Sequence, residues 1–249
     1  MKKKVLLSLL SVALIVTVSV GATMALLRDT TDEVVNTFTS DKAISISLRE
    51  PKWDGYGFEK TTLPSTEVLG EVTKISDTNY PKGTTAVDDD AKYGCNIASQ
   101  YMPGDTIPKN PIVKNTSEDE KVYVAVTVEC FRGQGTSAVS IPYGTATTDN
   151  SFVKDFGTLT FNEGTWTLLD TYDNKMVYVY GTAKAATELD IDAVTSTSVF
   201  KEVVLNDNLG EETTVLPSFE VKVNAYAVQV KNVEADEAVE ELKNFIHPN

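Results

Sequence analysis

The stretch Val122–Glu129 reads V-Y-V-A-V-T-V-E, with valine at every second position. Successive side chains of an extended chain point to opposite faces, so these valines share one face. Such alternation predicts a β-strand with one buried face. A second stretch, Phe219–Val230, alternates over a longer distance, and its apolar face holds Phe219, Val221, Val223 and Ala225. Both stretches therefore predict strands of a β-sheet.

Shorter stretches of the same kind occur along most of the chain. They are Ile44–Leu48, Leu159–Phe161, Trp166–Leu168, Met176–Tyr180 and Val199–Leu205. The residues N-E-G-T at Asn162–Thr165 are typical of a hairpin turn between two of these strands. Residues 51–57, 76–94 and 133–151 are rich in turn-forming residue types, which predicts loop insertions over a β-core.

The C-terminal segment shows a helical pattern instead. Its apolar residues recur at helical spacing, at Ala235, Ala238, Val239, Leu242, Phe245 and Ile246. Asp236 and Glu237 lie where the helix dipole favours negative charge, and Pro248 follows the last turn. We expect a helix over residues 235–246. The predicted fold class is all-β, a jelly-roll-like β-sandwich with one C-terminal α-helix and loop insertions.

The N-terminus has the layout of a secretory signal peptide. Lys2, Lys3 and Lys4 precede an apolar stretch over residues 5–20, and the small residues Gly21, Ala22 and Ala25 follow. A membrane-spanning helix needs about 20 predominantly apolar residues, and this stretch is shorter. We expect residues 1–25 to be removed by cleavage between Ala25 and Leu26, with an uncleaved N-terminal anchor as the alternative.

Composition limits the partners of the expected mature chain. Removing residues 1–25 leaves 19 basic residues against 36 acidic ones, a net charge of −17. Such a chain is repelled by nucleic acids and by anionic membrane surfaces. Cations or a cationic cell-wall partner fit better, and simple solubility is the alternative explanation. The remaining length is sufficient for one domain with its own core.

The two cysteines of the chain are Cys95 and Cys130. Disulfides form in exported proteins, where two free thiols are less common than one bridge. We therefore expect a disulfide between them after export.

The sequence contains few candidates for catalysis. The single histidine, His247, is close to the C-terminus, and the motifs H-E-x-x-H, G-x-S-x-G and C-x-x-C do not occur. Nothing in the spacing of the many carboxylates singles out a glycosidase-like pair. We therefore expect no enzyme activity, no catalytic residue and no required metal or cofactor.

Three further patterns have both a functional and a simpler interpretation. Asp88–Asp90 and Asp170–Asn174 contain oxygen ligands suited to calcium, although solvated turns explain them more simply. Asn115–Ser117 fits a glycosylation motif or a polar turn. Trp53 and Trp166 are expected to be packing residues rather than sugar platforms.

Three segments in this order resemble a known family. They are Thr23–Asp29 followed by Asn36–Thr39 and the Ile44 strand; Met102–Asp105 followed by Lys109, Pro111, Val113, Asn115 and the Tyr123 strand; and Phe219–Val223 followed by Ala225–Gln229 and the closing helix. Together they resemble the TasA/camelysin-type matrix proteins of Gram-positive bacteria, which are exported with a dedicated SipW-type signal peptidase. Residues 50–100 and 131–200 match this family poorly.

The resemblance implies a secreted or cell-surface protein that forms biofilm-matrix fibres. It implies a jelly-roll domain over residues 43–249 and an N-terminal donor segment, residues 26–42, that pairs with a sheet of the next subunit. The implied partners are further copies of the chain, a SipW-type signal peptidase and an accessory anchoring protein, with no nucleic acid and no membrane after cleavage. The apolar candidates for the donor contacts are Leu26, Leu27, Val34, Val35 and Phe38.

Two alternatives remain open. The N-terminal segment could be an ordinary strand that folds back into its own sheet. The family also implies a camelysin-like cell-surface metallopeptidase as a second function, although the usual zinc motif is missing from this sequence.

Overall fold

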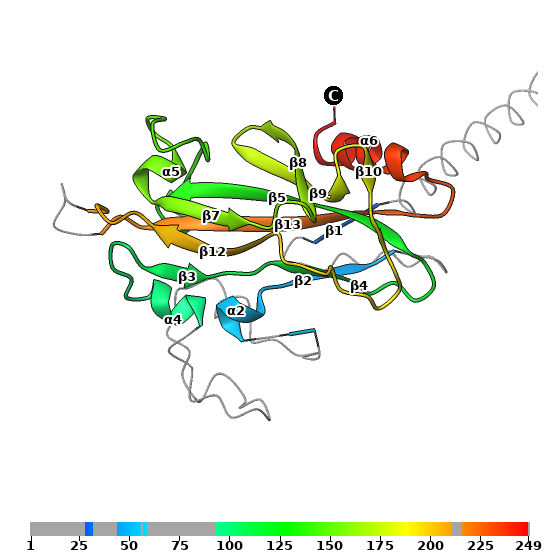
Figure 1. Cartoon of the computed structure of the whole chain (residues 1–249), viewed down its shortest axis with the longest axis horizontal. Coiled ribbons are helices and arrows are strands. Elements are labelled where there is room, and N and C mark those ends of the chain that lie inside the picture. Colours follow the sequence, from blue (N-terminus) through cyan, green and yellow to red (C-terminus); the bar gives the residue numbers. More distant parts are fainter. Residues whose placement is uncertain (1–27, 32–43, 56, 59–92, 211–215, 249) are drawn as a thin grey trace, which may run out of the picture.

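The computed structural model describes residues 28–31, 44–55, 57–58, 93–210 and 216–248 (Figure 1). The strands are β1 (Arg28–Thr31), β2 (Ile46–Arg49), β3 (Thr106–Pro108), β4 (Ile112–Asn115), β5 (Val122–Arg132), β6 (Val139–Ile141), β7 (Gly157–Phe161), β8 (Trp166–Tyr172), β9 (Lys175–Thr182), β10 (Ala185–Ala186), β11 (Glu188–Leu189), β12 (Phe200–Leu205) and β13 (Phe219–Gln229). The helices are α2 (Pro51–Asp54), α4 (Gly94–Ala98), α5 (Phe152–Asp155), α6 (Ala235–Ile246) and the 3₁₀ helix η2 (Gly135–Ser137). Strands dominate, so the predicted all-β class is confirmed.

The largest sheet is built on the two stretches that alternate most clearly in the sequence. Its strand order is β1-β13-β5-β9-β10, with β6 and β11 also paired to β5 and β8 paired to β9. β5 and β13 are antiparallel, and every residue of β13 from Phe219 to Gln229 has a partner on β5. This long ladder is the central feature of the fold.

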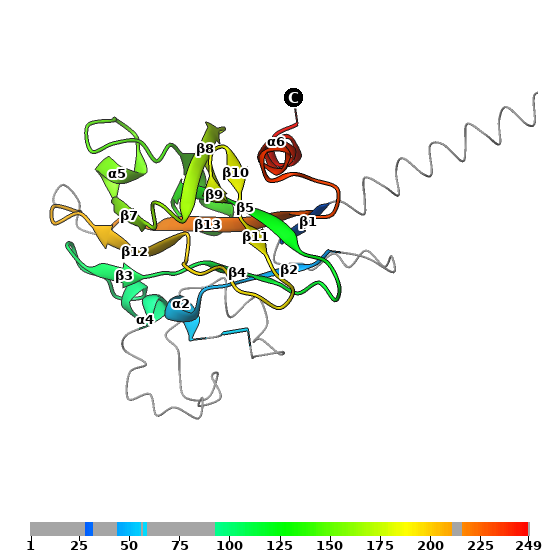
Figure 2. The same cartoon turned by 45° about the vertical axis from the view of Figure 1, so that its right-hand side comes forward.

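A second layer of strands packs against the large sheet (Figures 1 and 2). It contains the sheet β3-β12-β7 and the pair β2-β4. Hydrogen bonds between β4 and the residues before β12 extend it: the amide of Asn115 donates to the Ala193 carbonyl at 3.0 Å, and the amide of Thr195 donates to the Val113 carbonyl at 2.9 Å. The two layers enclose the main core.

β5 is buried on both faces, whereas alternation alone predicts only one buried face. Its four valines, Val122, Val124, Val126 and Val128, lie in the core between the layers. Tyr123 and Ala125 on the opposite face pack in a second core with Val239 and Leu242 of α6. Burying one such aliphatic side chain contributes about 1.5–3 kcal/mol. The helix therefore closes the second face of the large sheet.

The helix bounds predicted from the sequence, 235–246, are confirmed. At the N-terminus the side chains and backbone amides of Glu234 and Glu237 form a reciprocal capping box. At the C-terminus the hydroxyl of Tyr172 donates to the Ile246 carbonyl at 3.0 Å. Both ends of α6 are thus fixed, the second one by the last residue of β8.

The predicted hairpin at Asn162–Thr165 is wrong. β7 before it pairs with β12 of the second layer, whereas β8 after it pairs with β9 of the large sheet. The turn therefore passes from one layer to the other. Buried Trp166 fixes this passage, because its indole Nε1 donates to the Thr197 carbonyl at 3.1 Å. Its predicted packing role is confirmed.

Two predicted loops contain regular structure. Residues 133–151 include η2 and β6, which pairs with the end of β5, and residues 51–57 include α2. All three elements are short, and tertiary contacts rather than intrinsic propensity stabilise elements of this length.

The second segment of the family resemblance has structural roles. Gly104 turns the chain with a φ of 80°, and the Asp105 carboxylate accepts the amide of Met102 at 2.7 Å. Lys109 pairs with Glu50 at 2.6 Å, and its Nζ lies 4.8 Å from the centre of the half-buried Trp53 ring. The strands β3 and β4 follow this turn.

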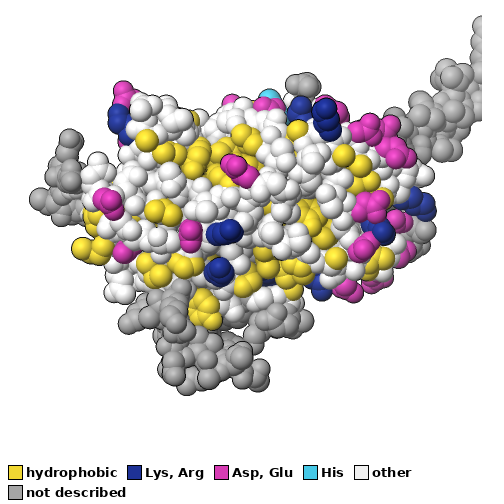
Figure 3. Space-filling view, viewed as in Figure 1, with side chains coloured by type: hydrophobic (Ala, Val, Ile, Leu, Met, Phe, Trp, Pro, Cys, Tyr) yellow, Lys and Arg dark blue, Asp and Glu magenta, His cyan; other side chains and the backbone are white. Residues whose placement is uncertain are grey.

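Acidic side chains gather at one end of the molecule, around the N-terminus of α6 and the turn before β5 (Figure 3). Among the described residues, no helix has the length and apolarity needed to cross a bilayer.

Candidate assembly site

The candidate site is the edge of β13 that faces away from β5, called here the β13 edge. β1 pairs with it antiparallel, with Arg28 opposite Val228 and Thr31 opposite Ala225. Within the described residues, no strand pairs with the remainder of this edge, Phe219–Asn224. Among the described strands, the β13 edge therefore has a paired half, Ala225–Val228, called here the covered half, and an unpaired half, Phe219–Asn224, called here the open half.

The burial of β13 changes between these halves. Ala225 and Ala227, which face the core from the covered half, have exposed fractions of 0%. Phe219, Val221 and Val223 continue the same face into the open half, and all three are only half-buried. The apolar face of β13 therefore loses part of its cover where β1 ends.

Aromatic rings hold the far end of the open half in place. The Phe219 ring lies 5.2 Å from that of Phe156, 5.4 Å from that of Phe152 and 5.8 Å from that of Tyr101, measured between ring centroids. The hydroxyl of Tyr101 donates to the Pro217 carbonyl. Aromatic contacts of this kind contribute beyond the burial of their area. The open half is thus a preformed strand.

The opposite face of the open half carries charged side chains. Lys222 lies over the Phe131 ring, with its Nζ 4.3 Å from the ring centroid, and pairs with Glu220 at 3.3 Å. These groups lie on the outer face of the ladder, since Glu220 is opposite Phe131 and Lys222 is opposite Glu129. The open half therefore has one apolar and one charged face.

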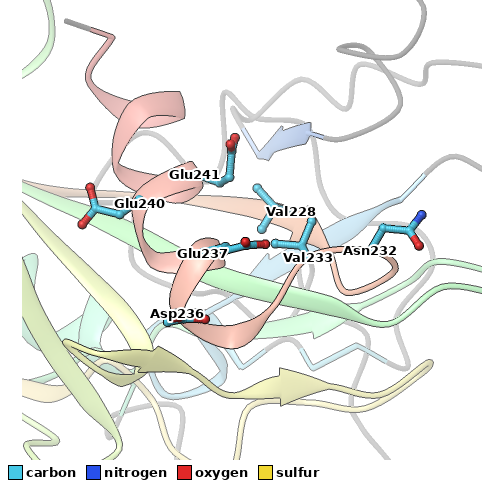
Figure 4. A pocket seen from close by; sticks show the side chains of 7 residues that line it. All are labelled: Val228, Asn232, Val233, Asp236, Glu237, Glu240 and Glu241. Carbon is cyan, nitrogen blue, oxygen red and sulfur yellow. The ribbon is translucent and has the colours of Figure 1, made fainter.

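A cleft lies beside the covered half, between β13 and α6 (Figure 4). Its lining residues are Val228, Asn232, Val233, Asp236, Glu237, Glu240 and Glu241. The lining combines two valines with four carboxylates and contains no basic side chain, so it disfavours anionic ligands.

Only part of the predicted donor segment can be located. Arg28–Thr31 form β1 and pair with the sheet of their own chain, as the folded-back alternative expects. Ala25, Leu26 and Leu27 of the predicted cleavage and donor sites lie outside the described residues, as do Val34, Val35 and Phe38.

The two cysteines are not brought together, and the expected bridge is not formed in this structure. Both are buried free thiols. Cys95 lies on α4, near Asp54 of α2, whereas Cys130 lies on β5 within the core between the layers. Burial raises the pKa of both thiols, that of Cys95 to about 12. The two side chains belong to different layers of the fold.

One calcium candidate can be located. Asp173 and Asn174 form a two-residue hairpin turn between β8 and β9, with φ angles of 44° and 65°. Asp88–Asp90 lie outside the described residues. Within the described residues, no group of three or more His, Cys, Asp or Glu side chains is placed to hold a metal ion.

The single histidine has a packing role. The His247 ring stacks on that of Tyr172, with centroids 4.1 Å apart and planes inclined by 2°. The pKa of Tyr172 is raised to about 12, and burial of its hydroxyl is the largest cause. Together these contacts attach the end of α6 to the end of β8.

The glycosylation motif at Asn115 is structural. The Asn115 side chain is fully buried, and its Nδ2 donates to the carbonyls of Glu120 at 2.9 Å and Leu189 at 3.1 Å. Its Oδ1 accepts the amide of Ser117 at 2.9 Å. All hydrogen-bonding groups of this amide are occupied, as the polar-turn interpretation predicts.

The sequence analysis named donor residues but no acceptor strand. The sequence shows only that the Phe219–Gln229 pattern is the longest alternating stretch, and it does not indicate which strand pairs with each edge. Comparisons of the chain with models of protein families, with curated proteins and with solved structures gave no match.

Proposed function

We propose that this chain is a secreted structural protein, a subunit of extracellular biofilm-matrix fibres. After cleavage between Ala25 and Leu26, the N-terminal segment of one copy pairs with the sheet of the next copy. The domain over residues 43–249 serves as the jelly-roll acceptor. The observation that carries the proposal is the pairing of β1 at the end of the large sheet, where a single short strand covers only part of a long one.

The mechanism requires no catalytic group. An added strand gains main-chain hydrogen bonds along a sheet edge, and its alternate side chains enter the adjoining apolar surface. The pairs that β1 makes within its own chain can also form with the β13 edge of another copy. The donor and acceptor surfaces are different. Two joined copies therefore still have one free donor segment and one free acceptor edge, so further copies can add and the assembly propagates.

A reversible lock between β1 and β13 tests this proposal. Thr30 is opposite Tyr226, and the Cα atoms of directly opposed antiparallel residues are about 4.5–5.5 Å apart, within disulfide range. The mature Thr30→Cys/Tyr226→Cys variant, oxidised as a monomer, should form no filaments in electron microscopy. After reduction it should assemble.

The matched control locks two strands that never need to separate. Lys222→Cys/Glu129→Cys joins β13 to β5, and this variant should assemble when oxidised as well as when reduced. Normal filaments from the oxidised β1 lock would contradict strand exchange. Absence of filaments from mature wild-type protein would contradict the fibre function.

A further inference from the structure

The main-chain groups of the open half have a defined direction. The carbonyl of Ser218 accepts the amide of Gly133 at 2.8 Å, and at the other end of β13 the amide of Val230 donates to the Lys121 carbonyl at 3.0 Å. Both contacts point towards β5, and the register between them is continuous. Successive residues of a strand direct their main-chain groups to alternate sides. Three residues of the open half therefore direct their amides and carbonyls away from β5: Phe219, Val221 and Val223.

The side chains of the open half alternate as well. The three apolar side chains lie on the inner face, whereas Glu220 and Lys222 lie on the outer face. The stretch Ser218–Asn224 reads S-F-E-V-K-V-N. On both sides of the central Val221 the order is charged, apolar, polar, and the charge is acidic on one side and basic on the other. A strand that pairs antiparallel with its own copy requires this kind of self-complementary pattern.

Two copies of this stretch fit each other in an antiparallel pair centred on Val221. A two-fold axis perpendicular to the large sheet places Val221 opposite Val221 of the second copy and Phe219 opposite Val223. The apolar faces of the two copies then continue each other. On the outer face, Glu220 of each copy lies opposite Lys222 of the other. Opposite charges in such pairs stabilise a strand pair, and the outward main-chain groups of the two copies exchange hydrogen bonds.

The charged side chains can take part in this contact. Within its own chain Lys222 pairs with Glu220 at 3.3 Å, and the two side chains remain 52% and 24% exposed. An ion pair at the surface contributes at most about 1 kcal/mol, so it does not withhold these charges from a second copy. Across the two-fold axis the four side chains alternate in sign.

The strand pair ends before it meets β1. β1 ends at Thr31, which is opposite Ala225. In the centred register the residue of the second copy that would reach Ala225 is Pro217. Proline has no amide hydrogen to donate, and the Pro217 carbonyl is occupied by the Tyr101 hydroxyl of its own chain. The second copy therefore leaves the ladder next to β1, and the covered half keeps its strand.

We infer that the open half is a self-association surface whose partner is the same stretch of a second copy. The contact is isologous, so it closes a dimer instead of starting a filament. One short strand pair is smaller than the interfaces of stable dimers, which bury about 1,200–2,000 Å² in total. The dimer is therefore weak and its population depends on protein concentration. None of this requires the proposed fibre function.

One consequence does rest on the proposed fibre function. A donor strand that extends beyond the covered half needs the same outward main-chain groups that the dimer uses. The dimer therefore competes with filament growth and holds the secreted chain in a closed form.

Charge reversal tests the pairing. Glu220→Lys places lysine opposite lysine, and Lys222→Glu places glutamate opposite glutamate, so both symmetry-related contacts become repulsive in each variant. Sedimentation of the soluble secreted chain over a wide range of concentrations should show a dimer for the wild type. Each single variant should dimerise about tenfold more weakly. A mixture of the two variants should recover the dimer, because every opposed pair then joins opposite charges.

The matched control is the double variant Glu220→Lys/Lys222→Glu, which should dimerise like the wild type. It loses the contact between the Glu220 carboxylate and the Gly135 amide just as Glu220→Lys does. A folding defect from that loss would therefore appear in both variants, whereas a pairing defect appears only in the single one.

Cross-linking tests the register. Glu220→Cys and Lys222→Cys meet in a pair without mutual hydrogen bonds, where opposed Cα atoms are about 4.5 Å apart, within disulfide range. The two variants, mixed and oxidised, should give about tenfold more linked dimer than either variant alone, because equivalent residues are too far apart to be bridged. The linked dimer should form filaments only after reduction.

The inference is overturned if the wild-type chain stays monomeric at all concentrations, if the mixed charge variants do not recover the dimer, or if mixing the cysteine variants adds no linkage. Filaments from the linked dimer would reject the competition. These outcomes are distinct from failure of the proposed function, which would appear as a wild-type dimer that never gives filaments.

Discussion

The two edges of the large sheet are held in different ways. At one edge β8 continues into β9 through the two-residue turn Asp173–Asn174, and its register shifts between Leu168 and Asp170. At the other edge β1 makes four residue pairs with β13, and residues 32–43 separate it from the next described segment. One edge strand is thus part of a tight hairpin, whereas the other is attached through a long connection.

This difference indicates which edge can exchange strands. β8 cannot leave without opening its hairpin, and its irregular register makes its outer side a poor template for another chain. β1 can leave after losing its contact with β2 and the hydrogen bonds of its four pairs with β13, each with a net contribution of about 0.5–1.5 kcal/mol. Assembly is therefore expected at the β13 edge and not at β8.

Deleting residues 26–40 should have the largest effect, a complete loss of filaments. The deletion removes the donor but leaves Ile44 and the layers that follow, so the variant should remain a folded monomer. Electron microscopy and circular dichroism measure the two properties. Charged replacements at Leu27 and Val35, which share one face of an extended strand, should have the same effect, because an unpaired charge against an apolar surface costs several kcal/mol. An unfolded deletion variant would instead identify the segment as a permanent strand of its own sheet.

A lysine at the open half should remove most filaments. Val221→Lys places a charge on the half-buried apolar face that the donor must cover, while in the monomer the long side chain can reach solvent. Its matched control is Leu168→Lys on β8, where the leucine is already 47% exposed. Filament yields measured by sedimentation should fall for the first variant only. Equal losses would show that both edges take part.

Comparison with the sequence shows what a linear pattern can predict. Periodicity predicts the strands that begin at Val122 and Phe219 and the bounds of α6. Burial of one face produces a repeat of two residues in a strand and of about 3.6 residues in a helix. The hairpin at Asn162–Thr165 failed because turn residues specify a local reversal and not which sheet receives the next strand. The β13 edge could not be predicted either, since strand order depends on contacts far apart in the sequence.

The reactivity of the Cys130 thiol should show that β5 and β13 stay paired when β1 leaves. Cys130 is opposite Val221 in the ladder between β5 and β13, and it is buried. Its raised pKa also keeps the thiolate fraction low. Alkylation followed by mass spectrometry should find both cysteines unmodified in the folded protein, with or without residues 26–40. After unfolding without reductant, both cysteines should be modified. Unmodified cysteines after unfolding would instead establish the disulfide expected for an exported protein.

The smallest effect is expected at Tyr172, where β8 ends. Its hydroxyl donates to the Ile246 carbonyl, so Tyr172→Phe should lower the free energy of unfolding by about 0.5–1.5 kcal/mol at neutral pH and leave filaments intact. The folded-state pKa of about 12 lies above the ordinary value of 10. The folded chain therefore holds this proton more tightly, and the resulting stability is complete below about pH 10 and lost as the pH rises towards 12. Urea unfolding of both proteins across this range should show a steeper decline for the wild type. Parallel curves would mean that the Tyr172 hydroxyl does not help to close the β8 edge against α6.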